Sequence, residues 1–391
     1  MPNKEITLSI MPVAREEAMR PVLDQFEAEK RIKVNLVMID WVSYRTRLVD
    51  IAVHSRGADV SAVTVPSTSD MIGMNALRPF SPIEIIELGG ASSYIPSAWN
   101  SVVDSESQRA WAIPWMIDCR YIFYWPEMLQ AAGIDEGTAF STSKHVSETA
   151  RKLIETGLDM PYAVPTEAYQ ILHAVSSYIW ETGGDVIKQD GSEVTFHKPE
   201  ALNAISEYFN MIRELPQQAY GPAGANLFFE KKVAFTISGG WFLNRAQSLV
   251  TGCVGLPGGS YLGGTNLVIW KHTQNTGAAF ELVKWLSRPD VQRQLSFTNG
   301  YLPSRMSLLT DPELLAGPVT GPRIRASETG RIYPCVPMIG LVEDRFSQEL
   351  ARVQRELPNR TGQDTAEVVR SIIEPLGRRL NLALGSGKTT P

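Results

Sequence analysis

The chain has 391 residues, of which 43% are hydrophobic and 20% are charged, and its formal net charge is −5. This length exceeds the usual size of a single hydrophobic core, so we expect two domains. The weakly acidic charge balance gives no electrostatic basis for binding nucleic acid or an anionic membrane. No segment reaches the roughly 18–20 consecutive apolar residues of a membrane span.

The cysteines and histidines indicate neither a disulfide framework nor a metal site. Cys119, Cys253 and Cys335 cannot all pair, and they show no CxxC spacing. The five histidines include no HExxH motif and no close pair. We therefore expect no metal and no cofactor.

The first third of the chain alternates between strand and helix patterns. Alternating or apolar runs predict strands at 5–10, 33–39 and 58–65, and the last is closed by a loop at 66–69. Between them lie two predicted helices, one with Pro21 at its first position and one over 43–55. This βαβαβ order predicts a mostly parallel sheet covered by helices, and hence the α/β class.

The remaining segments continue the mixed α/β pattern. An apolar run at 111–113 is interrupted by Pro114, and a new strand follows at 119–125. Further strands are expected at 186–188, 194–196, 233–237 and 265–271, and helices at 126–133, 144–156, 170–182, from Pro199 onward, and at 277–286. The tail over 340–384 reads as largely helical, with a break at Pro358.

The stretch from Phe228 to Trp241 is the most distinctive local pattern. A short strand ends in Gly239 and Gly240, which allow a backbone to approach another group closely, and Trp241 follows them directly. A tryptophan there can present a flat apolar face with one N–H donor. The same pattern also fits an ordinary strand end whose tryptophan belongs to the core.

The sequence lacks the common catalytic motifs. There is no GxSxG elbow and no GxGxxG after the first strand, and the terminal GSGKT lacks the first glycine of a P-loop. We therefore expect no enzyme. A glycan-processing enzyme with an acid pair stays open as the alternative from another class, and its candidate carboxylates are Asp104, Glu106, Asp118 and Glu127.

Three blocks of residues, in order, carry a family resemblance. The first block consists of Trp111–Trp115, Asp118, Ile122–Trp125 and Ala131–Ile134. The second consists of Trp180–Asp185 and Asp190–Gly191, and the third of Phe229–Ala234 and Ser238–Trp241. The pattern is completed by Gly263–Gly264, a helix over 278–295 and Gly300–Arg305. With these blocks the chain resembles the family 1 extracellular solute-binding proteins. These are carbohydrate-type receptors of ABC importers and include the maltose/trehalose-binding proteins. Departures from the family pattern at Lys231, Gly240, 125–126 and 111–112 bear on sugar specificity rather than on the fold.

The resemblance implies a type II periplasmic-binding-protein fold, in which two α/β lobes are joined by a hinge of two or three crossing strands and the ligand cleft lies between them. By that template the crossings are 107–114, 264–271 and one soon after Arg305. The N-terminal lobe would comprise 1–112 and 266–308, and the C-terminal lobe 113–265 and 309–391.

The resemblance also implies the function. The chain would capture a small solute, first of all a mono- or oligosaccharide, by lobe closure and deliver it as a monomer to the permease subunits of an ABC transporter. A non-sugar solute such as a polyamine or organic acid is the alternative. The first residues do not begin a signal peptide, so the protein is either cytoplasmic or a secretory leader has been removed. The family favours a periplasmic or extracellular location.

A sugar site needs aromatic plates for the C–H faces and polar groups for the hydroxyl rim. From the first lobe we expect contacts at the carboxyl ends of strands, where α/β proteins bind ligands. These candidates are Trp41, Tyr44, Ser67, Thr68 and Arg15. The resemblance adds Trp241, Trp115, Asp118, Gly239, Gly240, Tyr169, Gly264 and Arg305. Arg305 is equally compatible with a strut at the hinge, and Trp270 is expected in the core.

Overall fold

The computed structural model describes residues 4–104, 107–213, 215–216, 219–220, 223–245, 251–360 and 362–386. The chain divides into two compact units. Unit 1 comprises residues 1–118, 262–315 and 334–340, and unit 2 comprises 119–261, 316–333 and 341–391. The lobe boundaries expected from the sequence, 112/113, 265/266 and 308/309, lie four to seven residues away from these, and the return of 334–340 to unit 1 was not anticipated.

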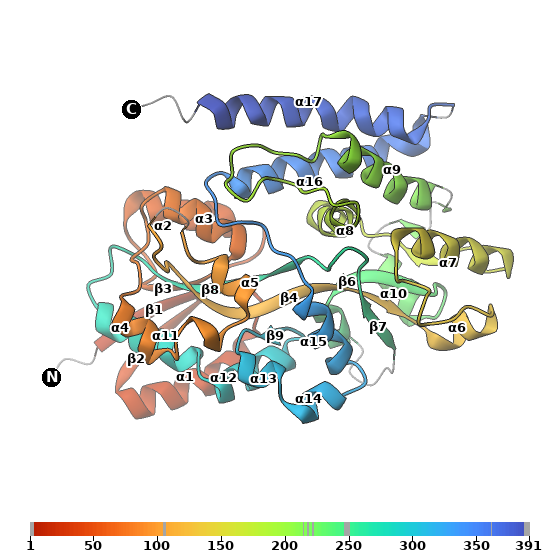
Figure 1. Ribbon diagram of the computed structural model, residues 1–391. Helices are drawn as coiled ribbons and strands as arrows, with labels where there is room; N and C mark the ends of the chain where they lie inside the picture. Colours follow the sequence, from red (N-terminus) through yellow and green to blue (C-terminus); the bar gives the residue numbers. More distant parts are fainter. Residues whose placement is uncertain are drawn as a thin grey trace. The chain divides into compact units, whose positions relative to one another are not determined.

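The sheet of unit 1 follows the predicted parallel pattern. Its strands are β1 (Lys4–Ile10), β2 (Ile32–Met38), β3 (Val60–Thr64) and β8 (Leu262–Ile269). They lie in the order β2-β1-β3-β8, with β1 parallel to both β2 and β3 and with β8 antiparallel to β3 (Figure 1). The strands predicted at 5–10, 33–39 and 58–65 are therefore confirmed, within two residues at most ends.

Helices cover this sheet. They are α1 (Glu16–Lys30), α2 (Tyr44–His54), α3 (Val65–Gly73), α4 (Pro82–Glu87), α5 (Pro96–Asn100), α11 (Thr276–Leu286), α12 (Pro289–Thr298), α13 (Met306–Leu309) and α14 (Pro312–Ala316), with the short 3-10 helix η1 (Ala91–Ser93). The predicted start of the first helix at Pro21 is wrong, because Arg15 already serves as the N-cap and Pro21 lies inside α1. The loop expected at 66–69 is wrong as well. Those residues form the first turns of α3, whose N-cap Thr64 accepts the N–H of Ser67.

Strand β4 (Ile113–Tyr124) takes part in both units. Within unit 1, Met116 and Ile117 pair with β9 (Leu302–Pro303), and within unit 2 the pairing resumes at Arg120. This change of partner explains why the unit boundary falls at 118/119. The sequence interpretation was wrong at two points here: Pro114 lies inside the strand, at its second residue, and 107–112 is no strand, because Val103 and Ala110 form a β-bridge that turns the chain back.

The segment 334–340 belongs to unit 1 because side chains of α2 and α3 hold it. Ser69 Oγ donates to the sulfur of Cys335 at 3.3 Å, and a guanidinium nitrogen of Arg45 donates to the Gly340 carbonyl at 3.4 Å. Gly340 lies so close to Asp70 that a Cβ there would be 2.3 Å from the carboxylate. This contact requires glycine unless the Asp70 side chain shifts.

The sheet of unit 2 is built on the second half of β4. Strands β6 (Phe235–Gly239) and β7 (Gly252–Gly255) pair antiparallel with it, and β5 (Tyr162–Ala163) pairs parallel with β6. Aromatic rings pack the core next to it: Tyr162 stacks on Phe235 at 5.0 Å between ring centroids, and Phe140 tilts against Phe235 at 5.3 Å. The predicted strand at 233–237 is thus present, displaced by two residues.

The helices of unit 2 are α6 (Pro126–Ala131), α7 (Ser143–Glu155), α8 (Ala168–Glu181), α9 (Pro199–Arg213), α10 (Ala223–Phe229), α15 (Thr320–Glu328), α16 (Ile339–Glu356, in unit 2 from residue 341) and α17 (Thr365–Ser386), with the 3-10 helices η3 (Gly240–Arg245) and η4 (Leu357–Asn359). Helix α9 packs against both α8 and α17 (Figure 1). Every residue of α8 from Ile171 to Trp180 is buried. The hairpin predicted over 186–196 is reduced to a single bridge between Ile187 and Val194.

The described part of the chain shows neither a membrane-spanning helix nor a cluster of metal-ligating side chains. None of the helices placed there combines the length and the apolar character needed to cross a bilayer. Within the same residues, no three side chains of His, Cys, Asp or Glu gather as a metal site would require.

Candidate functional site

In unit 1, an exposed tryptophan follows the carboxyl end of β2. The carboxylate of Asp40 accepts the backbone N–H of Ser43 at 2.8 Å and also its hydroxyl, and these hydrogen bonds lower the pKa of Asp40. The turn that they close holds Trp41 with 52% of its surface exposed. The Trp41 ring meets that of Tyr44 at 6.0 Å and 63°, an edge contact. Trp41 thus offers a large apolar face where the sequence predicts one.

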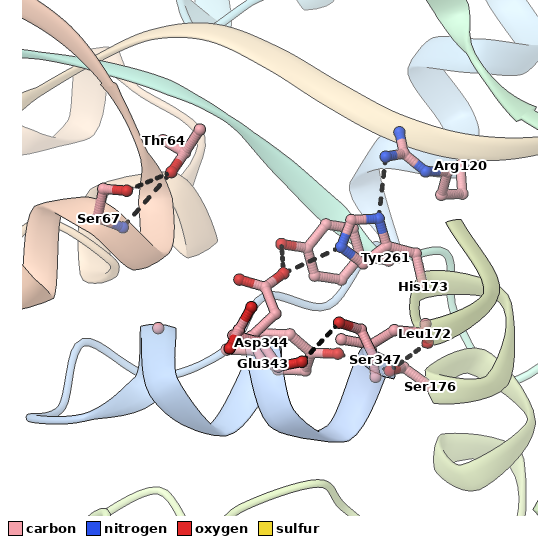
Figure 2. Close-up of polar contacts among 12 residues, drawn as sticks. Thr64, Ser67, Arg120, Leu172, His173, Ser176, Tyr261, Glu343, Asp344 and Ser347 are labelled. Carbon is pink, nitrogen blue, oxygen red and sulfur yellow. Dashed lines mark hydrogen bonds and ion pairs between the residues drawn. The ribbon is translucent and has the colours of Figure 1, made fainter. Parts of the chain in front are cut away.

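Behind Trp41, a small hydrogen-bond network centres on Thr64 at the end of β3. The Thr64 hydroxyl donates to Ser67 Oγ at 2.9 Å and accepts the Ser67 N–H at 3.4 Å (Figure 2). The Tyr44 hydroxyl accepts the Thr64 N–H at 2.7 Å, and burial raises the pKa of Tyr44. Thr68 is fully buried and accepts from Asn266 at 2.9 Å. The protein itself occupies the hydroxyl groups of Tyr44 and Thr68, so both residues support the network, and their expected contact with a ligand stays a prediction.

Three further expected contacts of unit 1 have structural roles instead. Trp115 is fully buried and its indole N–H donates to the Leu286 carbonyl at 3.2 Å, so it offers no free face. Gly264 has φ +130°, and a Cβ there would lie 2.0 Å from the Met116 carbonyl oxygen, so it serves the close approach of β8 to β4. Arg305 is a strut within unit 1, and the role at the hinge that the sequence leaves open stays a prediction.

Arg305 is 8% exposed, and its guanidinium donates to the carbonyl oxygens of Ser287 at 2.7 Å and Leu88 at 2.6 Å. The same guanidinium lies 4.3 Å from the ring centre of Tyr94. Burial lowers the pKa of Arg305, yet a guanidinium stays charged at any ordinary pH. Its donors are directed to the protein rather than to a solute.

Two candidates of unit 1 stay predictions. Asp118 is half-buried in β4, at the residue where unit 1 ends. Arg15 is exposed at the N-cap of α1, and its backbone N–H donates to Asn299 at 3.2 Å. Both positions are compatible with contact to a solute.

In unit 2, the glycines and the tryptophan of the 228–241 stretch lie at the end of β6. Gly239 pairs in the ladder with Arg120 of β4, and both glycines are buried. Trp241 follows in η3 and is partly exposed. The structure thus brings this stretch next to Arg120, a residue that the sequence did not single out.

Arg120 belongs to a buried polar chain that runs through His173 to Glu343. A guanidinium nitrogen of Arg120 lies 2.9 Å from His173 Nδ1, and His173 Nε2 lies 3.1 Å from Glu343 Oε1 (Figure 2). Because a guanidinium can only donate, Nδ1 carries no proton, and the Nε2–H must donate to the carboxylate. The hydrogen bonds therefore fix His173 as one neutral tautomer.

Two tyrosines enclose the His173 ring. Tyr261 stacks on it at 3.6 Å and 7°, and its hydroxyl donates to Glu343 at 3.5 Å. Tyr169, one turn earlier on α8, meets it edge-on at 5.9 Å and 65°. Arg120, Tyr261 and His173 are 3–5% exposed, whereas Tyr169 is 45% exposed. Arg120, His173 and Tyr261 are thus buried, whereas Tyr169, a predicted ligand residue, is open to solvent.

The electrostatics of the cluster keep the imidazole uncharged. Burial is the larger cause and the neighbouring Arg120 charge the smaller one, and together they hold the pKa of His173 well below its usual value. Nearby, burial raises the pKa of Tyr333, whose hydroxyl hydrogen-bonds Ser176 at 2.6 Å.

Sequence reasoning missed Arg120, His173, Tyr261 and Glu343. A local signal existed for two of them: Arg120 interrupts an apolar strand pattern and His173 interrupts an apolar helix. Such a polar residue in a buried element needs a partner. The partners Tyr261 and Glu343 come from distant segments, and nothing in their own neighbourhood marks them.

Unit 2 also contains a cavity of about 460 Å³ that includes none of the predicted site residues. It is lined by β7, the following turn and α15, through Phe140, Ser141, Cys253–Gly258, Pro322, Arg325, Ala326 and Thr329. Burial raises the pKa of Cys253 to about 12, so its thiol stays protonated.

Two of the carboxylates of the enzymatic alternative have partners within their own unit. Asp104 accepts the Ser107 N–H at 2.7 Å within a turn of unit 1. Glu127 of unit 2 pairs with Lys231, whose hydrogen bond lowers the pKa of Glu127, the opposite of what a general acid needs. Glu106 lies outside the described residues. These carboxylates give no support to an acid pair.

Comparison with known proteins gives consistent matches. A curated relative, the "Probable amino-acid ABC transporter periplasmic-binding protein y4oP" of Sinorhizobium fredii, is 28% identical over 54% of this chain and 52% of its own length. The "Diacetylchitobiose binding protein DasA" of Streptomyces coelicolor is 23% identical over 82% of this chain and 77% of its own. The chain therefore spans about half the length of the first of these relatives.

Solved structures share the whole fold. The sugar-binding protein MalE of Xanthomonas citri matches with a TM-score of 0.82 at 21% identity, over 98% of each chain. A solute-binding protein of Thermotoga lettingae bound with α-D-tagatose matches with a TM-score of 0.81 at 20% identity, over 98% of this chain and 100% of its own. The fold is thus that of the type II periplasmic binding proteins, as the sequence predicts.

The family described as "Bacterial extracellular solute-binding protein" matches residues 13–293, more than two thirds of the chain. That span includes β2 to β8 and the segments that carry Trp41, Arg120, Tyr169, His173 and Trp241. The resemblance inferred from sequence blocks is confirmed, and the chain belongs to the bacterial extracellular solute-binding proteins.

Proposed function

We propose that the protein is the solute-binding component of an ABC importer and that it captures a mono- or oligosaccharide. Membership of the extracellular solute-binding family supports the first part. The names of relatives and neighbours that bind diacetylchitobiose or tagatose support the second. The protein then acts outside the cytoplasmic membrane as a monomer, delivers its solute to the permease subunits and catalyses no reaction.

The observation that carries the sugar proposal is the exposed aromatic surface. Trp41 in unit 1 and Tyr169 in unit 2 are 52% and 45% exposed, and both stand beside supporting aromatic rings. Exposing a large aromatic ring to water is unfavourable, so a ring that packing holds in place and leaves open is suited to a ligand. Sugar C–H faces fit such rings.

Polar partners for sugar hydroxyl groups are proposed in each unit. In unit 1 they are Ser67, Asp118 and Arg15, and in unit 2 they are the backbone groups of Gly239 and Gly240. Trp241 supplies a further aromatic face. Hydrogen bonds to a charged group contribute about 1.5–3 kcal/mol, so Asp118 alone could fix the orientation of a sugar.

A charged solute is the second candidate. The chain of Arg120, His173 and Glu343 places ionic groups beside Tyr169, whereas the hydroxyl groups around Thr64 in unit 1 are neutral. A relative named as an amino-acid binding protein is compatible with such a solute. A cationic solute would be attracted by the Glu343 carboxylate, whose side chain is 17% exposed.

A thermal-shift and calorimetry panel tests the proposal. The panel contains maltotriose, N,N′-diacetylchitobiose, tagatose, polyamines and amino acids. A solute at 100 times its Kd stabilises the native state by about 2.7 kcal/mol and so raises the Tm by several degrees. We expect at least one sugar to do so.

Two substitutions locate the site. Trp41→Ala should remove the shift and leave the Tm of the ligand-free protein nearly unchanged, whereas Val42→Ala, at the adjacent residue that is 96% exposed, should leave binding intact. Binding of an amino acid or polyamine alone would favour the second candidate. Turnover of a glycoside that is lost on Asp118→Asn would contradict the receptor function.

A further inference from the structure

The His173 ring is fixed more firmly than its place one turn into a helix requires. An imidazole on a helix is free to rotate about its last side-chain bond, where the energy wells are broad. Here two hydrogen bonds act at opposite ends of the ring, from Arg120 on β4 and to Glu343 on α16. The Tyr261 ring covers its face at 3.6 Å. Three separate segments of unit 2 thus determine one side-chain orientation.

Beyond Tyr261, the aromatic neighbour of this fixed ring is Tyr169. The two residues are four apart on α8, the spacing that brings side chains together on one helix face. Their edge contact, at 5.9 Å and 65°, is the favourable arrangement of an aromatic pair. The Tyr169 side chain is 45% exposed, and besides the His173 ring it contacts Gln170, whose amide donates to its hydroxyl at 3.3 Å. The ring below it therefore contributes to where its open face points.

We propose that His173 is a positioning residue of the solute site, which holds the open ring of Tyr169 in the orientation that receives the solute. Arg120 and Glu343 act one step further away, because they hold the plane of the His173 ring (Figure 2). His173 itself is 5% exposed and does not contact the solute. The solute contact of Tyr169 rests on the proposed function, whereas the coupling between the two rings does not.

The charged and titratable groups around His173 explain why a neutral ring is used. They are Arg120 from β4, Glu343 from α16, Tyr261 from the segment before β8, and Tyr169 from α8 itself. A proton on Nδ1 would set two donors against each other at 2.9 Å and break the contact with Arg120. Burial and Arg120 outweigh the attraction of Glu343 for a charged ring, and the pKa of His173 is held well below its usual value. The positioning therefore persists across the physiological pH range.

Two substitutions distinguish the effect of the His173 ring from the effect of its hydrogen bonds. His173→Gln keeps an acceptor toward Arg120 and a donor toward Glu343 but removes the ring below Tyr169. His173→Phe keeps a ring between Tyr261 and Tyr169 but removes both hydrogen bonds, so its plane is no longer fixed. Both are made in the wild-type background and in the Tyr169→Ala background, and His173→Gln is the variant expected to fold in every case.

The first readout is the Kd for maltotriose, or for the panel sugar that binds. In the wild-type background we expect each His173 substitution to weaken binding at least tenfold. In the Tyr169→Ala background, where no ring remains to be positioned, we expect a change of at most twofold. An equal loss in both backgrounds, or no loss in either, would overturn the proposal, because His173 would then act on the fold or not at all.

The second readout needs no solute. In the ligand-free protein, 13C relaxation of the Tyr169 ring, assigned through Tyr169→Phe, reports how tightly the ring is held. We expect its order parameter to fall in His173→Gln, and the Nδ1 of His173 to stay unprotonated between pH 8 and 5.5 in the wild type. If the order parameter of the Tyr169 ring is the same in His173→Gln as in the wild type, the positioning role is contradicted. If only the solute panel fails, the proposed function alone is contradicted.

Discussion

The two units support their exposed aromatic rings in different ways. In unit 1, Trp41 meets the ring of Tyr44, whose hydroxyl joins a network of neutral groups with Thr64 and Ser67, all within residues 44–67. In unit 2, Tyr169 rests on a buried ionic chain of Arg120, His173 and Glu343, collected from distant segments. A change in the neutral network removes a hydrogen bond between uncharged groups, whereas a change at His173 removes a hydrogen bond from each of two charged groups, one of them buried.

The largest effect is expected where the ionic chain of unit 2 is cut. His173→Leu removes one acceptor of the buried Arg120 and one donor to Glu343, and losing the partner of a buried polar group costs about 1–3 kcal/mol, more where the group is charged. We expect the free energy of unfolding, measured by urea titration, to fall by about 3 kcal/mol. His173→Gln, which retains both polar contacts, should lose less than half as much. Equal stability of the leucine variant and the wild type would show that the chain is not needed for folding.

The next effect is a pH dependence that unit 2 has and the hydroxyl network of unit 1 lacks. Because the pKa of His173 is lowered in the folded state, the unfolded chain binds more protons below about pH 6.5. The contribution of the neutral His173 to the free energy of unfolding is therefore complete above that pH. It decreases as the pH falls, by up to about 1.4 kcal/mol per pH unit. Urea titrations at pH 7.5 and 5 should show a larger loss in the wild type than in His173→Gln. A pH dependence that is identical in both proteins would contradict the lowered pKa.

A smaller effect is expected in the neutral network of unit 1. Thr64→Ala removes the N-cap hydroxyl of α3 and its bond to Ser67, and such caps contribute about 0.5–2 kcal/mol. The loss should be near 1 kcal/mol by urea titration. Ser43→Ala is the control, since Ser43 is the N-cap of α2 but its side chain makes no capping hydrogen bond to the helix. It removes only the exposed hydrogen bond to Asp40, so its cost should be smaller. If Thr64→Ala lowered the free energy of unfolding as much as His173→Leu, the proposed difference between the supporting networks of the two units would be contradicted.

The smallest effect on stability is expected at the exposed ring itself. Trp41 is half exposed, so Trp41→Ala should lower the free energy of unfolding by less than about 1 kcal/mol. Thermal unfolding without solute checks this value. A loss of several kcal/mol would mean that Trp41 holds unit 1 together rather than serving a ligand.

The sequence was informative where structure and function depend on neighbours in the chain. Alternation of apolar residues located β1, β2 and β3, and the rule that ligands bind at the carboxyl ends of strands led to Trp41. The same reasoning was misled at Pro114, which β4 accommodates near its start, and at Trp115, because a tryptophan in a strand can face either the core or a ligand.

What the sequence could not supply is the pairing of distant residues. Arg120 and His173 each interrupt an apolar pattern, which signals a need for partners but does not name them. His173 and Glu343 are 170 residues apart, and only the fold brings them to 3.1 Å. Likewise, the carbonyl groups that bind Arg305 come from Leu88 and Ser287, so its role as a strut could not be read from its own neighbourhood.

The most direct test of the central claim is calorimetric titration of the panel sugars into the wild-type protein and into Trp41→Ala and Tyr169→Ala. We expect one-site binding of at least one sugar to the wild type and a loss of at least tenfold in affinity in each variant, with little change in ligand-free stability. Absence of binding by every sugar, or unchanged affinity in both variants, would contradict it.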